Sequence, residues 1–162
     1  IDGAELYIPD DNNPDWRDAK KFLDSEELWN KNGRTIVLYG DVYFTDEAMD
    51  TIVNYKPKEW RLFGCFDKGE CFAQSFHSEH IPKHRESLDK ICKQQKYQRV
   101  GGWEHYREME GFDLGDHRVG KLFYEIDDLT NDFDFPKDYE QFMENYKASS
   151  SEPVKESKKI VQ

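Results

Sequence analysis

The stretch Ile36-Val37-Leu38-Tyr39-Gly40-Asp41-Val42-Tyr43-Phe44 decides the fold expected for this chain. Its apolar run predicts a buried strand over residues 35–39, because such strands are rich in β-branched and aromatic residues. Gly40 lets the backbone approach closely at the end of that strand. Asp41 is then expected at the carboxyl edge of a sheet, where open α/β sheets bind their ligands. A carboxylate in that place suits a hard cation such as Mg²⁺.

Strand and helix patterns alternate along the chain, an order that is typical of an α/β fold. A hairpin turn at Asp67-Lys68-Gly69 joins two of the strands, so a mixed sheet is expected. Residues 99–117 are rich in glycine and aromatic residues and are expected to form a loop with partial helix. The other expected elements are strands at 4–8, 35–39, 60–66, 71–76 and 119–126, and helices that start at Pro14, after Thr45, at residue 82 and at Pro136.

Apolar residues at helical spacing give each expected helix one inner face. Asn13 is expected to cap the first helix and Thr45 the second. The expected inner residues are Trp16, Ala19, Phe22, Leu23, Leu28 and Trp29 in the first helix, Met49, Ile52 and Val53 in the second, Leu88, Ile91 and Cys92 in the third, and Tyr139, Phe142, Met143 and Tyr146 in the last.

The bulk composition narrows the classes of partner. The chain has 162 residues and a formal net charge of −11, which argues against nucleic acids and anionic membranes as partners. No apolar run reaches transmembrane length, and the first residues lack the pattern of a signal peptide. A cytoplasmic protein with reduced thiols is expected, and a disulfide between Cys65 and Cys71 is the less favoured alternative. A homo-oligomer is compatible with the sequence.

A second acidic stretch gives Asp41 a partner. It is Asp132-Phe133-Asp134-Phe135-Pro136-Lys137-Asp138-Tyr139-Glu140, and it leads into the last expected helix. Together with the strand that ends at Asp41, it resembles the nucleotidyltransferases and related glycosyltransferases of the type-A nucleotide-diphospho-sugar fold. In that family a metal-binding aspartate at a strand end is followed much later by an Asp-x-Asp-x-Pro-x-Asp segment before a C-terminal helix.

The resemblance implies a three-layer α/β sandwich with a mixed, mostly parallel sheet over residues 1–147. It also implies that Asp41 and Asp134 are catalytic, and that Asp41 with Asp132 or Asp134 holds Mg²⁺ or Mn²⁺. Asp138 would cap or brace the last helix. Residues 148–162 are rich in Ser, Lys and Glu and are expected to form a disordered tail.

The family normally opens with a strand and a glycine-rich, basic loop that wraps the nucleotide. Residues 1–13 contain one glycine and no Lys or Arg, so this loop has no counterpart there. Either the domain is N-terminally incomplete, or its nucleotide site is absent or built differently.

The glycine pair at Gly101-Gly102 is expected on the sugar or acceptor side of the site. Trp103 is suited to stacking on a sugar ring, and Glu104 and Arg107 to binding hydroxyls or phosphates. Arg99 is a further candidate for a phosphate contact. The simpler interpretation is a loop that Trp103 pins to the core, since large aromatic residues are mostly buried.

Three functions follow from these residues. The first is a metal-dependent nucleotidyltransferase that acts on a sugar phosphate and a nucleoside triphosphate. The second is a glycosyltransferase that uses a nucleotide sugar and a sugar acceptor. The third is a non-catalytic binding or assembly domain that has lost the nucleotide loop. The acids also have a simpler interpretation, in which Asp41 caps a turn and Asp132 and Asp134 flank a helix N-terminus.

The histidines His77, His80 and His84 lie close together in the sequence. His80 and His84 are four residues apart, the spacing of a zinc-binding pair on one helix face. The stretch lacks the rest of that pattern, so a solvated helix start is favoured over a zinc site.

Overall fold

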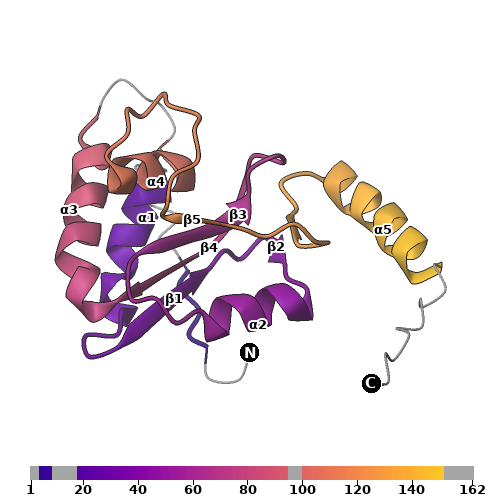
Figure 1. The fold of residues 1–162 in the computed structure, drawn as a ribbon, viewed down its shortest axis with the longest axis horizontal. Helices are drawn as coiled ribbons and strands as arrows, with labels where there is room; N and C mark the ends of the chain where they lie inside the picture. Colours follow the sequence, from indigo (N-terminus) through magenta and orange to yellow (C-terminus); the bar gives the residue numbers. More distant parts are fainter. Residues whose placement is uncertain (1–3, 9–17, 95–99, 152–162) are drawn as a thin grey trace, which may run out of the picture.

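A four-stranded sheet with the order β1-β4-β3-β5 lies at the centre of the fold. The structure is a computed structural model and describes residues 4–8, 18–94 and 100–151. A second, two-stranded sheet formed by β2 and β6 stands beside the first, and helix α5 projects from it (Figure 1). The expectation of an α/β fold with a mixed sheet is confirmed.

Three of the four central strands run in the same direction. β1 (Arg34–Leu38) and β3 (Arg61–Cys65) are each antiparallel to β4 (Glu70–His77), which lies between them, and β3 is parallel to β5 (Phe123–Glu125). The expectation of mostly parallel pairing is therefore wrong, because the return strand of the hairpin inserts between β1 and β3. The carboxyl ends of β1, β3 and β5 still share one edge, and β4 begins at that edge.

Helices cover both faces of the central sheet (Figure 1). α1 (Asp18–Asp24), α3 (Ile81–Cys92) and α4 (Gly102–Glu110) pack on one face, and α2 (Asp46–Asn54) packs on the other. We call the cluster beside α1, α3 and α4 the first core and the cluster beside α2 the second core. The first contains Ala19, Trp29, Trp60, Leu62, Phe76, Leu88, Ile91, Val100, Tyr106, Met109, Leu114, Leu122 and Phe123, and the second Ala48, Ile52, Phe63, Cys65, Phe72, Ala73 and Ile126.

Successive side chains of β1 pack alternately against the two cores. Ile36 and Leu38 pack against the second core and Val37 packs against the first, as the two-residue period of a strand requires. Arg34 ties the start of the strand to α2, because its guanidinium donates hydrogen bonds of 2.9 and 2.6 Å to two carbonyl oxygens near the end of that helix. These carbonyls have no partner within the helix.

The start of α2 is fixed by the cap that the sequence predicts. The Thr45 hydroxyl accepts a hydrogen bond of 3.0 Å from the Ala48 amide and donates to the Asp128 carboxylate. The Thr45 amide donates to the Thr130 hydroxyl at 3.2 Å. Burial alone would raise the pKa of Asp128, but the hydrogen bonds from both threonines lower it. This network anchors the chain between β5 and β6 to the second core.

Two expected elements differ in the structure. Residues 4–8 form no strand, and Leu6 and Ile8 are 81% and 73% exposed, because an apolar segment without a strand partner gains no ladder hydrogen bonds. Residues 102–110, within the stretch expected to be a loop with partial helix, form the regular helix α4. Its N-terminal glycines disguise its helical spacing. The expectations for Asn13, Pro14 and Trp16 lie outside the described residues.

The remaining helices match their expected positions. The inner face expected for α3 (Leu88, Ile91 and Cys92) is confirmed, and the others match in part. Ala19 and Trp29 are buried, whereas Leu28 and Val53 are 39% and 49% exposed. In α5 (Pro136–Ser151) only Phe142 of the predicted residues is buried, and Tyr139 is 53% exposed. The helix continues into the segment expected as a tail, and residues 152–162 lie outside the described part of the chain.

Candidate acidic site at the sheet edge

Asp41 lies just beyond the carboxyl end of β1 and directly before β2 (Val42–Tyr43). β2 pairs antiparallel with β6 (Asn131–Asp132), and the register places Asp132 opposite the residue that follows Asp41. The Phe133 amide donates a hydrogen bond of 3.0 Å to the Asp41 carbonyl oxygen. Two acidic segments far apart in the sequence thus meet at one edge of the central sheet.

Glu70 is a further acid at this edge, and sequence reasoning missed it. Burial first, and then the negative charges of Asp132, Asp134 and Asp138, together raise the pKa of Glu70 to about 7. Burial also raises the pKa of Asp132, with smaller contributions from Asp134 and Asp41. Glu70 therefore keeps its proton up to about neutral pH and donates it in a hydrogen bond to Asp132. Burial and mutual repulsion thus disfavour full ionisation of the carboxyl groups at this edge.

The position of Glu70 in the hairpin is the signal that could have found it. It is the first residue of β4, and β4 begins at the edge where β1 ends. An acid that follows a hairpin turn is a common solvated residue, so the pattern alone does not distinguish it. Only the insertion of β4 beside β1 brings Glu70 to the same edge as Asp41.

The other predicted acids have different positions. Asp134 is exposed, and its negative charge contributes to the raised pKa values of Glu70 and Asp132. Asp138 accepts a hydrogen bond of 2.7 Å from the Phe135 amide at the start of α5, so it braces that helix as predicted. An acid in the first turn also complements the helix dipole.

The predicted substrate residues form the first turns of α4. Glu104 accepts a hydrogen bond of 2.8 Å from the Gly101 amide, which satisfies one of the unpaired donors at the helix start. Arg107 is 9% exposed and forms an ion pair of 3.1 Å with Glu104. Trp103 donates a hydrogen bond of 2.7 Å to the Gly69 carbonyl oxygen and stacks on Phe123. These side chains brace the fold, in agreement with the simpler interpretation.

We call the sheet edge that carries Asp41, Glu70 and Asp132 the acidic edge. The N-terminus of α4 nevertheless lies beside it. A Cβ added to Gly102 would lie 3.0 Å from the Tyr39 hydroxyl and 3.1 Å from the Cys71 Sγ, so Gly102 is needed for close packing there. Burial first, and then the charges of Glu70 and Glu104, raise the pKa of the Cys71 thiol. The start of α4 and the acidic edge are thus neighbours across the first residues of β4. Arg99 lies outside the described residues.

The residues that could hold a cation are carboxylates only. Among residues 4–8, 18–94 and 100–151, no three His, Cys, Asp or Glu side chains converge as a metal-binding group. Mg²⁺ is commonly bound by one or two carboxylates, with waters and substrate phosphates as the other ligands. Asp41 and Asp132 fit that donor set, and their mutual repulsion is what a cation would relieve.

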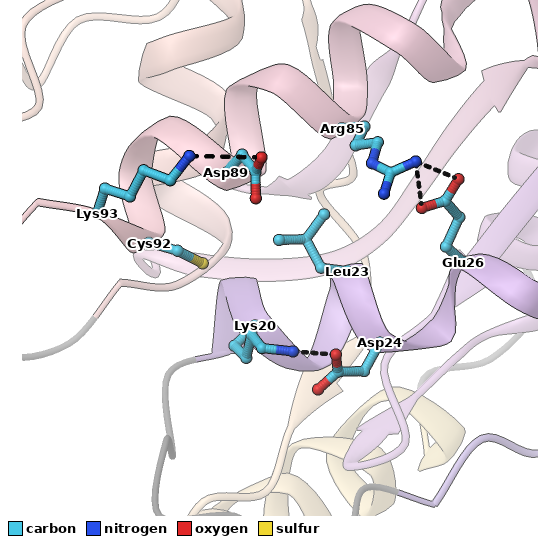
Figure 2. Close-up of a pocket in the computed structure, with 8 residues that line it drawn as sticks. All are labelled: Lys20, Leu23, Asp24, Glu26, Arg85, Asp89, Cys92 and Lys93. Carbon is cyan, nitrogen blue, oxygen red and sulfur yellow. Dashed lines mark hydrogen bonds and ion pairs between the residues drawn. The ribbon is translucent and has the colours of Figure 1, made fainter.

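A pocket of about 380 Å³ lies elsewhere, between the α1–η1 segment and α3 (Figure 2); η1 is Ser25–Leu28. Its charged side chains pair with one another: Arg85 with Glu26 at 3.3 Å, and Lys93 with Asp89 at 3.6 Å. None of its lining residues belongs to the acidic edge. The lining residues are Lys20, Leu23, Asp24, Glu26, Arg85, Asp89, Cys92 and Lys93.

The histidines and cysteines form no metal centre in the described part of the chain. His80 pairs with Glu79 at 3.6 Å, but His84 is 1% exposed. The interpretation of His84 as part of a solvated helix start is therefore wrong, because its helix turns it into the first core. Cys65 and Cys71 are not joined in a disulfide.

No protein-family model, curated protein or solved structure significantly matches this chain. Within the described residues, none of the helices combines the length and the apolar composition needed to cross a bilayer.

Replacing Glu70 with glutamine tests the charge balance of this edge. The pKa of Glu70 is about 7 in the folded protein, against 4.5 for an unperturbed glutamate. Folded protein thus keeps a proton that the unfolded chain releases, so Glu70 lowers stability progressively as pH rises from about 4.5 to about 7. We expect Glu70→Gln to raise the melting temperature above about pH 7 and to change it little near pH 4.5.

Glu86→Gln is the matched control, because Glu86 is an exposed acid on α3. It removes the same charge away from the edge. Equal effects of the two substitutions at both pH values in thermal unfolding experiments would contradict the conclusion that ionisation of Glu70, which burial and the neighbouring acids oppose, destabilises the fold.

Proposed function

We propose that the chain is a metal-dependent, nucleotidyltransferase-like protein that acts on a sugar phosphate and a nucleoside triphosphate. The observation that carries this proposal is the meeting of Asp41 and Asp132 where β1 ends. Ligands of open α/β sheets bind at the carboxyl ends of the strands. Two carboxylates there can bind a divalent cation together with phosphate oxygens.

Each residue of the edge has a distinct role in this proposal. Asp41 and Asp132 would bind Mg²⁺ or Mn²⁺, with Asp134 as the exposed alternative to Asp132. The cation would neutralise phosphate charge while an oxygen attacks phosphorus. While no cation is bound, Glu70 would keep its proton and donate a hydrogen bond to Asp132. When a cation binds, Glu70 would release that proton. The space beside Gly40, with nothing within 4 Å of an added Cβ, would leave room for a ligand next to Asp41.

Titration calorimetry of the wild type with nucleoside triphosphates and nucleotide sugars, each with Mg²⁺ or Mn²⁺, tests the proposal. We expect metal-dependent binding that Asp41→Asn weakens by at least about tenfold, since even partners outside the first coordination shell contribute that much. Asp50→Asn is the control: Asp50 is exposed on α2, and its replacement removes the same charge. Equal binding by both variants, or no metal-dependent binding by the wild type, would overturn the proposal.

Product analysis separates two kinds of transfer at the same edge. Release of pyrophosphate marks nucleotidyl transfer, and release of a nucleoside diphosphate marks glycosyl transfer from a nucleotide sugar. The second product would replace the nucleotidyltransferase by the glycosyltransferase while leaving the metal site in place.

A non-catalytic binding domain is the second candidate. It is favoured by Arg107, whose guanidinium is paired with Glu104 and donates to the Asp116 carbonyl oxygen, rather than being open to a phosphate. A folded protein whose melting temperature does not respond to any nucleotide with metal would support this candidate.

A further inference from the structure

His84 and His105 form a buried pair inside the first core. Their ring centroids are 4.7 Å apart, and the side chains are 1% and 0% exposed. His84 comes from α3 and His105 from α4, so the pair lies where the two helices meet above the sheet. His84 Nδ1 and both ring nitrogens of His105 have no hydrogen-bond partner among the described residues. Buried polar atoms are rarely left in this state.

The surroundings of the pair are aromatic and uncharged. Phe76 lies 4.2 Å and Trp29 4.7 Å from His84, and Trp60 lies 4.9 Å from His105, all between ring centroids. These contacts come from β4, from the residue after η1 and from the residue before β3. The polar groups behind these rings are Gln74 and Ser25, which accept hydrogen bonds from the two indoles.

Charged side chains on both helices have partners other than the two rings. Arg85 pairs with Glu26, Asp89 with Lys93 and Arg107 with Glu104, and Glu110 accepts a hydrogen bond from the Leu122 amide. Lys83 donates to the Met109 carbonyl oxygen, and Lys90 pairs with Glu108. Burial lowers the pKa of His84 to about 3. Burial first, and then the charge of His84, lower the pKa of His105 well below its usual value. No carboxylate contributes to either pKa, so a proton on the pair would be an uncompensated buried charge.

We infer that the His84–His105 pair is an acid-sensitive latch, which holds α3 and α4 on the sheet when neutral and releases that helical layer when protonated. The second core lies on the opposite face, and the aromatic residues that contact the pair, Trp29, Trp60 and Phe76, all belong to the first core. As the pH falls, α3 and α4 on the first-core face therefore open before α2 on the opposite face. Release of α4 would also move Gly102 away from Tyr39 and Cys71.

Hydrogen exchange of the whole chain between about pH 7 and about pH 4, corrected for the intrinsic pH dependence of exchange, tests the latch. The unfolded pKa of histidine is about 6.5. Below it, each histidine that takes up a proton on opening raises the opening equilibrium about tenfold per pH unit. We expect protection of α3 and α4 amides to fall about a hundredfold per pH unit, while α2 amides lose less. Equal losses in α2, α3 and α4 would overturn selective release.

Substitutions identify the groups responsible. His84→Leu and His105→Leu are each expected to reduce the slope to about tenfold per pH unit, and the double variant to abolish it. His80→Gln is the control, since His80 lies before α3 and pairs with Glu79, and it is expected to keep the full slope. An unchanged slope in the double variant would overturn the inference. If that variant does not fold, imidazole nitrogen shifts of the wild type decide: protonation of either ring before α3 and α4 lose protection would overturn it.

Discussion

Replacing Trp60 with alanine is expected to lower the free energy of unfolding by about 4 kcal/mol, the largest effect of a single substitution that we predict. Trp60 is 1% exposed and packs against His105. Its Nε1 donates a hydrogen bond of 3.1 Å to Gln74 Oε1, and Gln74 is itself 1% exposed. The substitution therefore creates a cavity in the first core and also leaves a buried acceptor without this donor.

Trp60→Phe separates the two contributions. Phenylalanine fills most of the cavity but cannot donate to Gln74, so a loss of about 1–2 kcal/mol is expected. Urea unfolding followed by circular dichroism measures both variants. A Trp60→Ala variant within about 1 kcal/mol of the wild type would contradict the central place of Trp60 in the first core.

Replacing Gly64 with alanine is expected to lower the free energy of unfolding by about 3 kcal/mol. Gly64 lies in β3, at an irregular register with β4. A Cβ there would lie 2.3 Å from the carbonyl oxygen of Glu70, and backbone on a paired strand cannot move away cheaply. The Gly64 carbonyl oxygen also accepts a hydrogen bond of 2.8 Å from the Ile126 amide, which ties β3 to the chain after β5.

Gly40→Ala is the matched control for Gly64→Ala. An added Cβ at Gly40 has nothing within 4 Å, and Gly40 does not have a positive φ. The free energy of unfolding of the Gly40→Ala variant is expected to stay within about 0.5 kcal/mol of that of the wild type in the same urea experiment. Equal losses in the two variants would show that the close approach of β3 and β4 is not what requires glycine at position 64.

Patterns local in the sequence predicted much of the fold. The apolar run before Asp41 forms β1, Thr45 caps α2, and the turn at Asp67-Lys68-Gly69 joins β3 to β4. Gly69 has φ of 77°, a conformation that glycine adopts without strain. These features depend on a few neighbouring residues, which is why composition and spacing are enough to predict them.

The elements that differ from the sequence-based expectation are those whose secondary structure depends on contacts with distant residues. Leu6 and Ile8 have the alternation of a strand, but a strand forms only where another strand supplies hydrogen bonds. Helix α4 begins at Gly102, directly after the N-cap residue Gly101, and glycine is a poor helix former. It is held by packing of Tyr106 and Met109 in the first core.

The buried histidines illustrate the same limit. His84 lies next to polar residues in the sequence, and only the docking of α3 against α4 shows that it faces His105 in the first core. Burial of a polar ring without a hydrogen-bond partner is disfavoured on its own. It is tolerated here through the aromatic packing around it.

By itself, the sequence determined the strand that ends at Gly40-Asp41, the second acidic segment before α5 and the alternation of helices and strands, because each depends on local propensity and periodicity. The tertiary structure decided which acids meet. Pairing of β2 with β6 brings Asp132 to Asp41, and insertion of β4 between β1 and β3 adds Glu70. Strand order is set by burial of both faces of the sheet, a property of the whole chain that no local pattern contains.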